Sequence, residues 1–148
     1  MKLGELLNTK EFKYQVVVTI GQNESVATAI RKMIEYDRGS LPVCDDKGEV
    51  VGIVTERDIV RRCFALDLAP AKVKMRDIMT KELIVGLKED DLDYAISVMK
   101  DKRIRHLPIV DNRKVIGMIS MRDLLGYELE EYRSQAHLLD NYISGSYR

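Results

Sequence analysis

A short motif that combines a hydroxyl, an arginine and an aspartate occurs twice in the sequence. Its members are Thr55, Arg57 and Asp58 in the first copy, and Ser120, Arg122 and Asp123 in the second. An ionised aspartate can accept hydrogen bonds from two neighbouring ribose hydroxyls. The hydroxyl and the guanidinium, which stays charged, can bind phosphate oxygens. The motif therefore indicates a binding site for a nucleotide.

The same aspartates also have a purely structural interpretation. An aspartate at the turn between a strand and a helix often only caps the helix, which stabilises a protein by about 1 kcal/mol. A single copy fits either interpretation equally well. Two copies, each with an adjacent arginine and an upstream hydroxyl, favour ligand binding.

The motif is part of a longer internal repeat. Residues 16–60 and 82–125 follow one pattern at an offset of 66, which falls to 65 where a loop is one residue shorter. Matching pairs are Ala29 and Ala95, Met33 and Met99, Leu41-Pro42 and Leu107-Pro108, Asp45 and Asp111, Gly52 and Gly117, and Asp58 and Asp123. The chain is therefore predicted to contain two copies of one structural unit.

Each copy predicts a strand, a helix, two strands and a second helix. The apolar runs 16–20 and 83–85 are rich in β-branched residues and predict buried strands. Apolar residues at helical spacing then predict helices that begin after Ser25 and Asp91. Segments 41–44 and 50–54, and 107–110 and 115–119, predict two hairpins, the first with Gly48 at positive φ. Asp58 and Asp123 are predicted to open the closing helices, and 126–143 to form a further helix.

Composition limits the function classes. The 148 residues include 24 basic and 24 acidic side chains, so no overall positive field favours nucleic acid or an anionic membrane. The hydrophobic fraction of 45% predicts a folded protein. Two cysteines without flanking histidines predict neither a zinc site nor a disulfide framework. With no leader or long apolar run, the chain is expected to be cytoplasmic.

In these motifs the sequence resembles the CBS domain. The resemblance rests on Leu-Pro before the second strand and on the closing pattern Gly-x-x-Thr/Ser-x-x-Asp, which occurs as 52–58 and 117–123. It implies an α/β (α+β) fold in which two βαββα repeats pack sheet to sheet about a pseudo-two-fold axis. The expected division is a first repeat with its lead-in at 1–65, a linker at 66–81, a second repeat at 82–127, and a C-terminal helix and tail at 128–148.

The resemblance also implies two nucleotide clefts, each built from both repeats. We call them the Asp58 cleft and the Asp123 cleft. The Asp58 cleft is expected to combine Asp58, Arg57 and Thr55 with Thr80, Ile84, Arg105, His106, Leu107 and Pro108. The Asp123 cleft is expected to combine Asp123, Arg122 and Ser120 with Val18, Gly39, Ser40, Leu41 and Pro42, and with Lys10 as a weaker candidate.

Such modules bind AMP, ADP, ATP, NAD(H) or S-adenosylmethionine, sense rather than catalyse, and often form homodimers. AMP is the first expectation for this chain. The basic run 100–106 beside the Asp58 cleft predicts that this cleft favours more phosphates or binds more tightly. The same run could instead be a solvated helix end, where cations complement the helix dipole.

The sequence also bears on two other classes of function. No nucleophile with an adjacent base can be assembled from the two histidines, so the chain is not expected to be an enzyme. A ligand-independent dimerisation or protein-interaction module is the alternative to nucleotide sensing, because the segment from Leu124 to Tyr142 is amphipathic. No metal site, nucleic acid or membrane is expected, and a regulated protein partner is not identified by the sequence.

Overall fold

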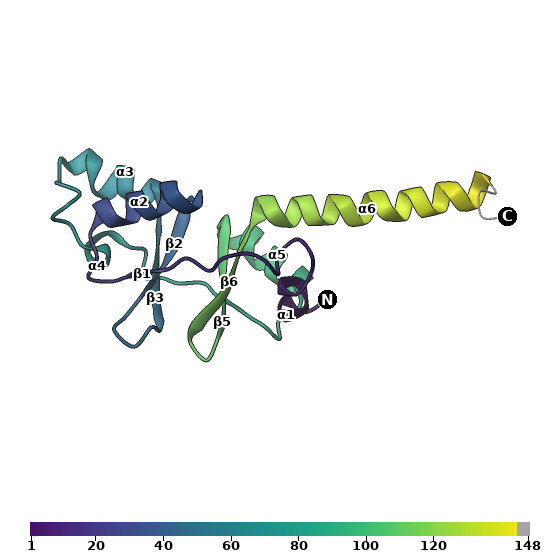
Figure 1. The fold of residues 1–148 in the computed structure, drawn as a ribbon, viewed down its shortest axis with the longest axis horizontal. Helices are drawn as coiled ribbons and strands as arrows, with labels where there is room; N and C mark the ends of the chain where they lie inside the picture. The colour runs from purple at the N-terminus through teal and green to yellow at the C-terminus, as the bar shows by residue number, and fades with distance from the viewer. Residues whose placement is uncertain (145–148) are drawn as a thin grey trace.

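A computed structural model gives the fold and describes residues 1–144. The last four residues of the expected tail, 145–148, lie outside the described residues. Figure 1 shows two small sheets side by side, each with its own helices, and one long helix that leaves the second unit. Within residues 1–144, no helix has the length and apolarity required to cross a bilayer.

Each unit contains a three-stranded sheet whose central strand pairs with one parallel and one antiparallel neighbour. The strands of the first sheet are β1 (Ile20–Gly21), β2 (Ser40–Cys44) and β3 (Val50–Thr55). Those of the second are β4 (Gly86–Leu87), β5 (His106–Asp111) and β6 (Lys114–Ser120). The predicted α+β fold with duplicated units is confirmed.

The hairpin strands agree with the prediction, whereas the first strand of each unit does not. Buried strands were predicted at 16–20 and 83–85, but pairing starts only at Ile20 and Gly86 and lasts two residues. Val16 and Val17 are 59% and 40% exposed. The prediction was wrong there because a β-branched run also suits an extended crossing segment with no partner strand.

The predicted amphipathic helices are confirmed as α2 (Val26–Tyr36) and α5 (Leu92–Lys102). The Ser25 hydroxyl caps α2 by accepting a hydrogen bond from the Thr28 N–H. After β3 the chain forms α3 (Glu56–Arg62) and a short 3₁₀ helix, η1 (Phe64–Leu66). After β6 it forms α6 (Met121–Ser144) without a break, so the separate helix predicted at 126–143 is a continuation of the closing helix.

The two units exchange their lead-in segments. Helix α1 (Leu3–Leu7) precedes the first unit but packs in the second core, and α4 (Met75–Ile78) precedes the second unit but packs in the first core. The backbone contacts are equivalent in the two places: Leu3 N–H donates to Asp90 O at 2.8 Å, and Met75 N–H donates to Glu24 O at 2.9 Å. Each unit is therefore completed by a segment that belongs to the other repeat.

Both copies of the motif contain a glycine at a place where the exchanged segment passes close to the sheet. A Cβ on Gly52 would lie 2.7 Å from the Met79 sulfur and 2.9 Å from the Thr80 carbonyl oxygen. A Cβ on Gly117 would lie 2.6 Å from a methyl group of Leu7. These glycines therefore allow a close approach, whereas Gly48 serves a turn and has the predicted positive φ of 78°.

Replacing Gly52 tests this close approach. Gly52→Ala is expected to lower the free energy of unfolding by about 1–3 kcal/mol, because the Thr80 backbone cannot move aside easily. Gly126→Ala is the matched control. In α6 its Cβ would meet nothing within 4 Å, so alanine should raise stability by about 0.5–1 kcal/mol through helix propensity. Urea denaturation measures both, and a Gly52→Ala protein as stable as the wild type would contradict the packing argument.

Candidate nucleotide site

A cavity of about 380 Å³ opens where the end of β3 meets the residues before β5. It is the Asp58 cleft. Its lining residues are Gly39, Ile53, Thr55, Glu56, Arg57, Thr80, Arg103, Ile104, Arg105 and His106. The structure thus brings together five residues predicted for this cleft: Thr55, Arg57, Thr80, Arg105 and His106. It also places Gly39 here, although that residue was predicted for the Asp123 cleft.

Asp58 lies next to this cavity and forms hydrogen bonds with two of its lining residues, Thr55 and Thr80. Its carboxylate accepts the Thr55 N–H at 3.0 Å, while the Thr55 hydroxyl accepts the Asp58 N–H at 3.1 Å. The Thr80 hydroxyl donates to the same carboxylate at 3.2 and 3.3 Å. Asp58 is only 8% exposed. The structural role of this aspartate, helix capping, is therefore present, and a ribose would use the remaining acceptor sites of the carboxylate or displace the Thr80 hydroxyl.

Thr80 lies close to Asp58 because the segment that follows α4 pairs with β3. The Thr80 and Ile53 backbones exchange two hydrogen bonds, at 2.8 and 3.1 Å. The Arg62 side chain fastens the same segment by donating to the carbonyl oxygens of Ile78 and Met79. The exchanged lead-in segment therefore forms one wall of the cleft.

The lining charges of this cavity are mainly positive. Arg57, Arg103 and Arg105 are opposed by Glu56 in the lining and by Asp58 next to it. Arg103 ends α5 in the left-handed region, with φ of 54°, and Asp37 ends α2 in the equivalent way, with φ of 52°. A cation thus stands in the second repeat where the first repeat has an anion. This difference in charge makes the Asp58 cleft more suitable for an anionic ligand than the equivalent region of the first repeat.

His106 faces acidic groups from two helices. Burial lowers its pKa below the ordinary value of 6.5, and the nearby Arg105 acts in the same direction. The carboxylates of Asp123 and Glu56 act in the opposite direction and raise this pKa. Burial is the largest cause, so the neutral ring is favoured in the folded protein. His106 therefore interacts electrostatically with acidic groups of both aspartate motifs, Glu56 in the first and Asp123 in the second.

A second cavity, of about 880 Å³, contains Arg122 and Asp123 and is the Asp123 cleft. It lies between the segment before β1, the end of α2 and the start of α6. Its other lining residues are Glu11, Phe12, Tyr14, Gln15, Val16, Tyr36, Arg38, Gly126, Tyr127, Leu129 and Glu130. The two arginines here face three carboxylates, those of Glu11, Asp123 and Glu130. This cavity is therefore less favourable for phosphate than the Asp58 cleft.

Several predicted site residues do not line either cavity. Ser40, Leu41, Pro42, Leu107 and Pro108 are buried in the strands. Val18 packs against the first core and Ile84 against the second. The Ser120 hydroxyl accepts the Asp123 N–H at 3.0 Å, as a helix cap. Lys10 is exposed and lies outside the residues that line the Asp123 cleft.

Sequence analysis missed four residues of the Asp58 cleft: Ile53, Glu56, Arg103 and Ile104. Glu56 lies inside the repeated motif, and Arg103 belongs to the basic run noted before β5. A signal was therefore present for these two. The isoleucines were indistinguishable from core residues in the apolar pattern.

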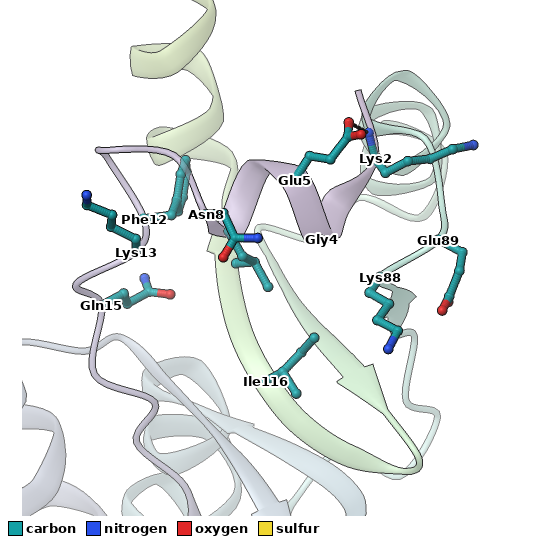
Figure 2. A pocket seen from close by; sticks show the side chains of 11 residues that line it. Lys2, Gly4, Glu5, Asn8, Phe12, Lys13, Gln15, Lys88, Glu89 and Ile116 are labelled. Carbon is teal, nitrogen blue, oxygen red and sulfur yellow. Dashed lines mark hydrogen bonds between the residues drawn. The ribbon is translucent and has the colours of Figure 1, made fainter.

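A third hollow, of about 650 Å³, lies beside α1 and is shown in Figure 2. Its side chains come from α1, the segment after it, the loop after β4, and β6. It contains lysines and glutamates together, including Lys2, Lys88 and Glu89, but none of the predicted site residues. Within residues 1–144, no group of three or more His, Cys, Asp or Glu side chains is placed to hold a metal ion.

Comparison with known proteins bears directly on these clefts. The CBS domain family model matches the chain twice, at residues 10–65 and 75–130. This chain belongs to the CBS domain family. It is a tandem CBS pair, and a CBS pair is a regulatory module.

Three relatives indicate how close the similarity is. The mitochondrial CBS domain-containing protein CBSX3 of Arabidopsis thaliana is 33% identical over 84% of this chain and 63% of its own length. A CBS-domain-containing protein of Agrobacterium tumefaciens has a solved structure with a TM-score of 0.75 and 28% identity, over 86% of this chain and 99% of that one. The chain spans less than two thirds of CBSX3 and 58% of a curated relative from Methanopyrus kandleri.

The third relative is the CBS domain pair of protein MJ0100. Its structure has a TM-score of 0.67 and 28% identity, over 74% of this chain and 89% of that one. That protein was solved in complex with 5-methylthioadenosine and S-adenosyl-L-methionine. A CBS pair similar to this chain therefore binds adenosine-containing molecules.

The lowered pKa of His106 predicts a pH dependence of stability. The folded protein binds a proton at His106 less readily than the unfolded chain does. The contribution of this group to the free energy of unfolding is therefore complete above pH 6.5 and is lost as the pH drops below that value. Urea denaturation at pH 7.5 and 5.5 should show a smaller loss for His106→Gln than for the wild type. Equal losses in the two proteins would contradict the burial of a neutral ring.

Proposed function

We propose that this tandem CBS pair is a regulatory module that binds a phosphorylated adenosine in the Asp58 cleft. The observation that carries the proposal is the surplus of three arginines over the carboxylates of Glu56 and Asp58 around a cavity of about 380 Å³. This volume lies within the range of about 300–1,000 Å³ that small-molecule sites occupy. The adenosine ligands of the MJ0100 pair support the choice of ligand class.

The lining side chains suit the three parts of a nucleotide. Ile53 and Ile104 offer apolar surface for the adenine ring. The Asp58 carboxylate, with the Thr55 and Thr80 hydroxyls beside it, suits the ribose. Arg57, Arg103 and Arg105 supply charged donors for phosphate oxygens.

AMP is the first ligand proposed, and ADP, ATP or NADH are the alternatives. The charge of the Asp58 cleft favours ligands with more phosphates, whereas the three carboxylates of the Asp123 cleft oppose them. We propose that the chain senses the nucleotide without converting it, that it acts as a homodimer, and that it is cytoplasmic. It is proposed to need neither nucleic acid nor a membrane.

A ligand-independent interaction module is the second candidate. The observation in its favour is the exposed apolar surface of α6, where Tyr132, Tyr142 and Ile143 are 73–77% exposed. The two candidate functions predict different results of a nucleotide titration, since only a sensor is required to bind the nucleotide.

Two equivalent arginines provide the test. Arg57 and Arg122 occupy matching places in the repeats, and both are exposed, so alanine at either position should leave the fold intact. In calorimetric titrations, Arg57→Ala should weaken ATP binding roughly 10-fold, because an exposed cation contributes less to phosphate binding than a buried one. The loss for AMP should be smaller, and Arg122→Ala should leave the tight ATP site unchanged.

Two results would count against the proposal. If AMP, ADP, ATP, NADH and S-adenosylmethionine all fail to bind the wild-type protein, the interaction module is favoured. If both variants lose affinity equally for AMP and ATP, the assignment of the phosphates to the Asp58 cleft is wrong.

A further inference from the structure

Most of α6 lies outside the body of the molecule. Its first two turns are anchored by Leu124, which is 1% exposed, and by Tyr127, which packs against the second core. Residues 128–140 are all exposed. Figure 1 shows the helix continuing away from both sheets. Beyond Leu129 and Glu130, which line the Asp123 cleft, this part of α6 is exposed and buries no residue within residues 1–144.

The exposed part carries apolar residues at coiled-coil spacing. They follow one another at alternating intervals of four and three residues: Leu125, Leu129, Tyr132, Ala136, Leu139 and Ile143. We call this set the α6 seam. Alternation of four and three is the heptad pattern whose a and d positions face a partner helix. Leu129, Ala136 and Ile143 take the a positions, and Leu125, Tyr132 and Leu139 take the d positions.

The seam is open to solvent, and only its first part, at Leu129, also lines the Asp123 cleft. Leu125 is 57% exposed, Leu129 49%, Leu139 60% and Ile143 75%. Leu124 anchors the helix one residue before Leu125, so the buried side and the seam differ by about 100° around the helix axis. A partner helix can therefore reach the seam without displacing the anchor.

An unpacked helix of this kind needs a partner. Isolated helices shorter than about 12–15 residues are only marginally stable in water, and most helix stability in proteins comes from packing of an apolar face. We propose that the α6 seam packs against the α6 seam of a second copy of this chain, as a parallel, in-register, two-stranded coiled coil. This proposal does not depend on nucleotide binding.

The charges beside the seam favour the parallel orientation. In a parallel pair, the g position of one heptad faces the e position of the next heptad on the other helix. Glu128 at g would then face Arg133 at e of the second copy, and the pair forms twice by symmetry. In the antiparallel pair that matches a with d, Arg133 would instead face its own copy across the symmetry axis. Opposite charges attract in the first arrangement, and like charges repel in the second.

Two adjacent leucines test the seam in the full-length chain. Leu139 lies in the seam, whereas Leu138, which is similarly exposed at 55%, lies beside it. Analytical ultracentrifugation should show a wild-type dimer. Leu139→Glu should raise the dimer dissociation constant about 100-fold or more, because both copies lose a buried leucine. Leu138→Glu should change it much less, and circular dichroism should show that both variants keep the folded body.

Disulfide trapping tests the orientation. In a parallel in-register pair, the two Ala136 side chains face each other at an a layer, so Ala136→Cys should form a disulfide-linked dimer on mild oxidation. Ser134→Cys, on the opposite face of α6, is the control and should stay unlinked. In the antiparallel pair Ala136 would face Tyr132 instead and no link would form.

Three outcomes would overturn the proposal. One is a wild-type protein that stays monomeric at every concentration, whether or not it binds a different protein. Another is an equal effect of Leu138→Glu and Leu139→Glu on the dimer. The third is failure of Ala136→Cys to link while the dimer persists, which would leave a dimer of another geometry.

Discussion

The backbone hydrogen bonds of the exchanged lead-in segments are the interaction on which the rest of this structure depends. The N–H groups of Leu3 and Gly4 donate to backbone carbonyl oxygens just before α5, in the second unit. Those of Met75 and Arg76 donate to the carbonyl oxygens just before α2, in the first unit. Because each core is completed by a segment from the other repeat, neither core is complete without the other half of the chain. The exchange also fixes the Asp58 cleft, since the segment that carries Met75 continues directly to Thr80.

The exchange explains which parts of the fold were predictable. Helices α2 and α5 and the two hairpins could be predicted because periodicity and turn residues such as Gly48 are local signals. Val16 and Val17 were misassigned because their apolar character shows only a preference for extended backbone, and the partner strand is not encoded locally. The sequence between the repeats was expected to be a linker, and nothing in its pattern shows that Met75 and Ile78 complete the first core.

The same distinction applies to the site. The repeated motif and the basic run led to Thr55, Arg57, Arg105 and His106, which the structure brings together around one cavity. Ser40 and Leu107 share the apolar environment of a strand, and their burial follows from sheet packing that single-residue patterns do not reveal. Gly39 was assigned to the opposite cleft because the division of residues between two symmetric sites depends on how the units face each other.

The two halves of the molecule differ in charge although they share a backbone plan. Arg103 replaces Asp37 at equivalent helix ends, and Arg105 and His106 stand where the first repeat has Gly39 and Ser40. The duplicated scaffold thus presents one cavity with a cationic surplus and one with an anionic surplus. This asymmetry supports one preferred phosphate site per chain.

The most direct test of nucleotide binding in the Asp58 cleft is a proton NMR titration that follows the two histidine rings. His106 lines the cleft, while His137 lies on the exposed part of α6 and serves as an internal reference. Addition of AMP or ATP should shift the His106 ring resonances in a saturable manner and leave those of His137 in place. A His106 signal that is unchanged by either nucleotide would contradict the account.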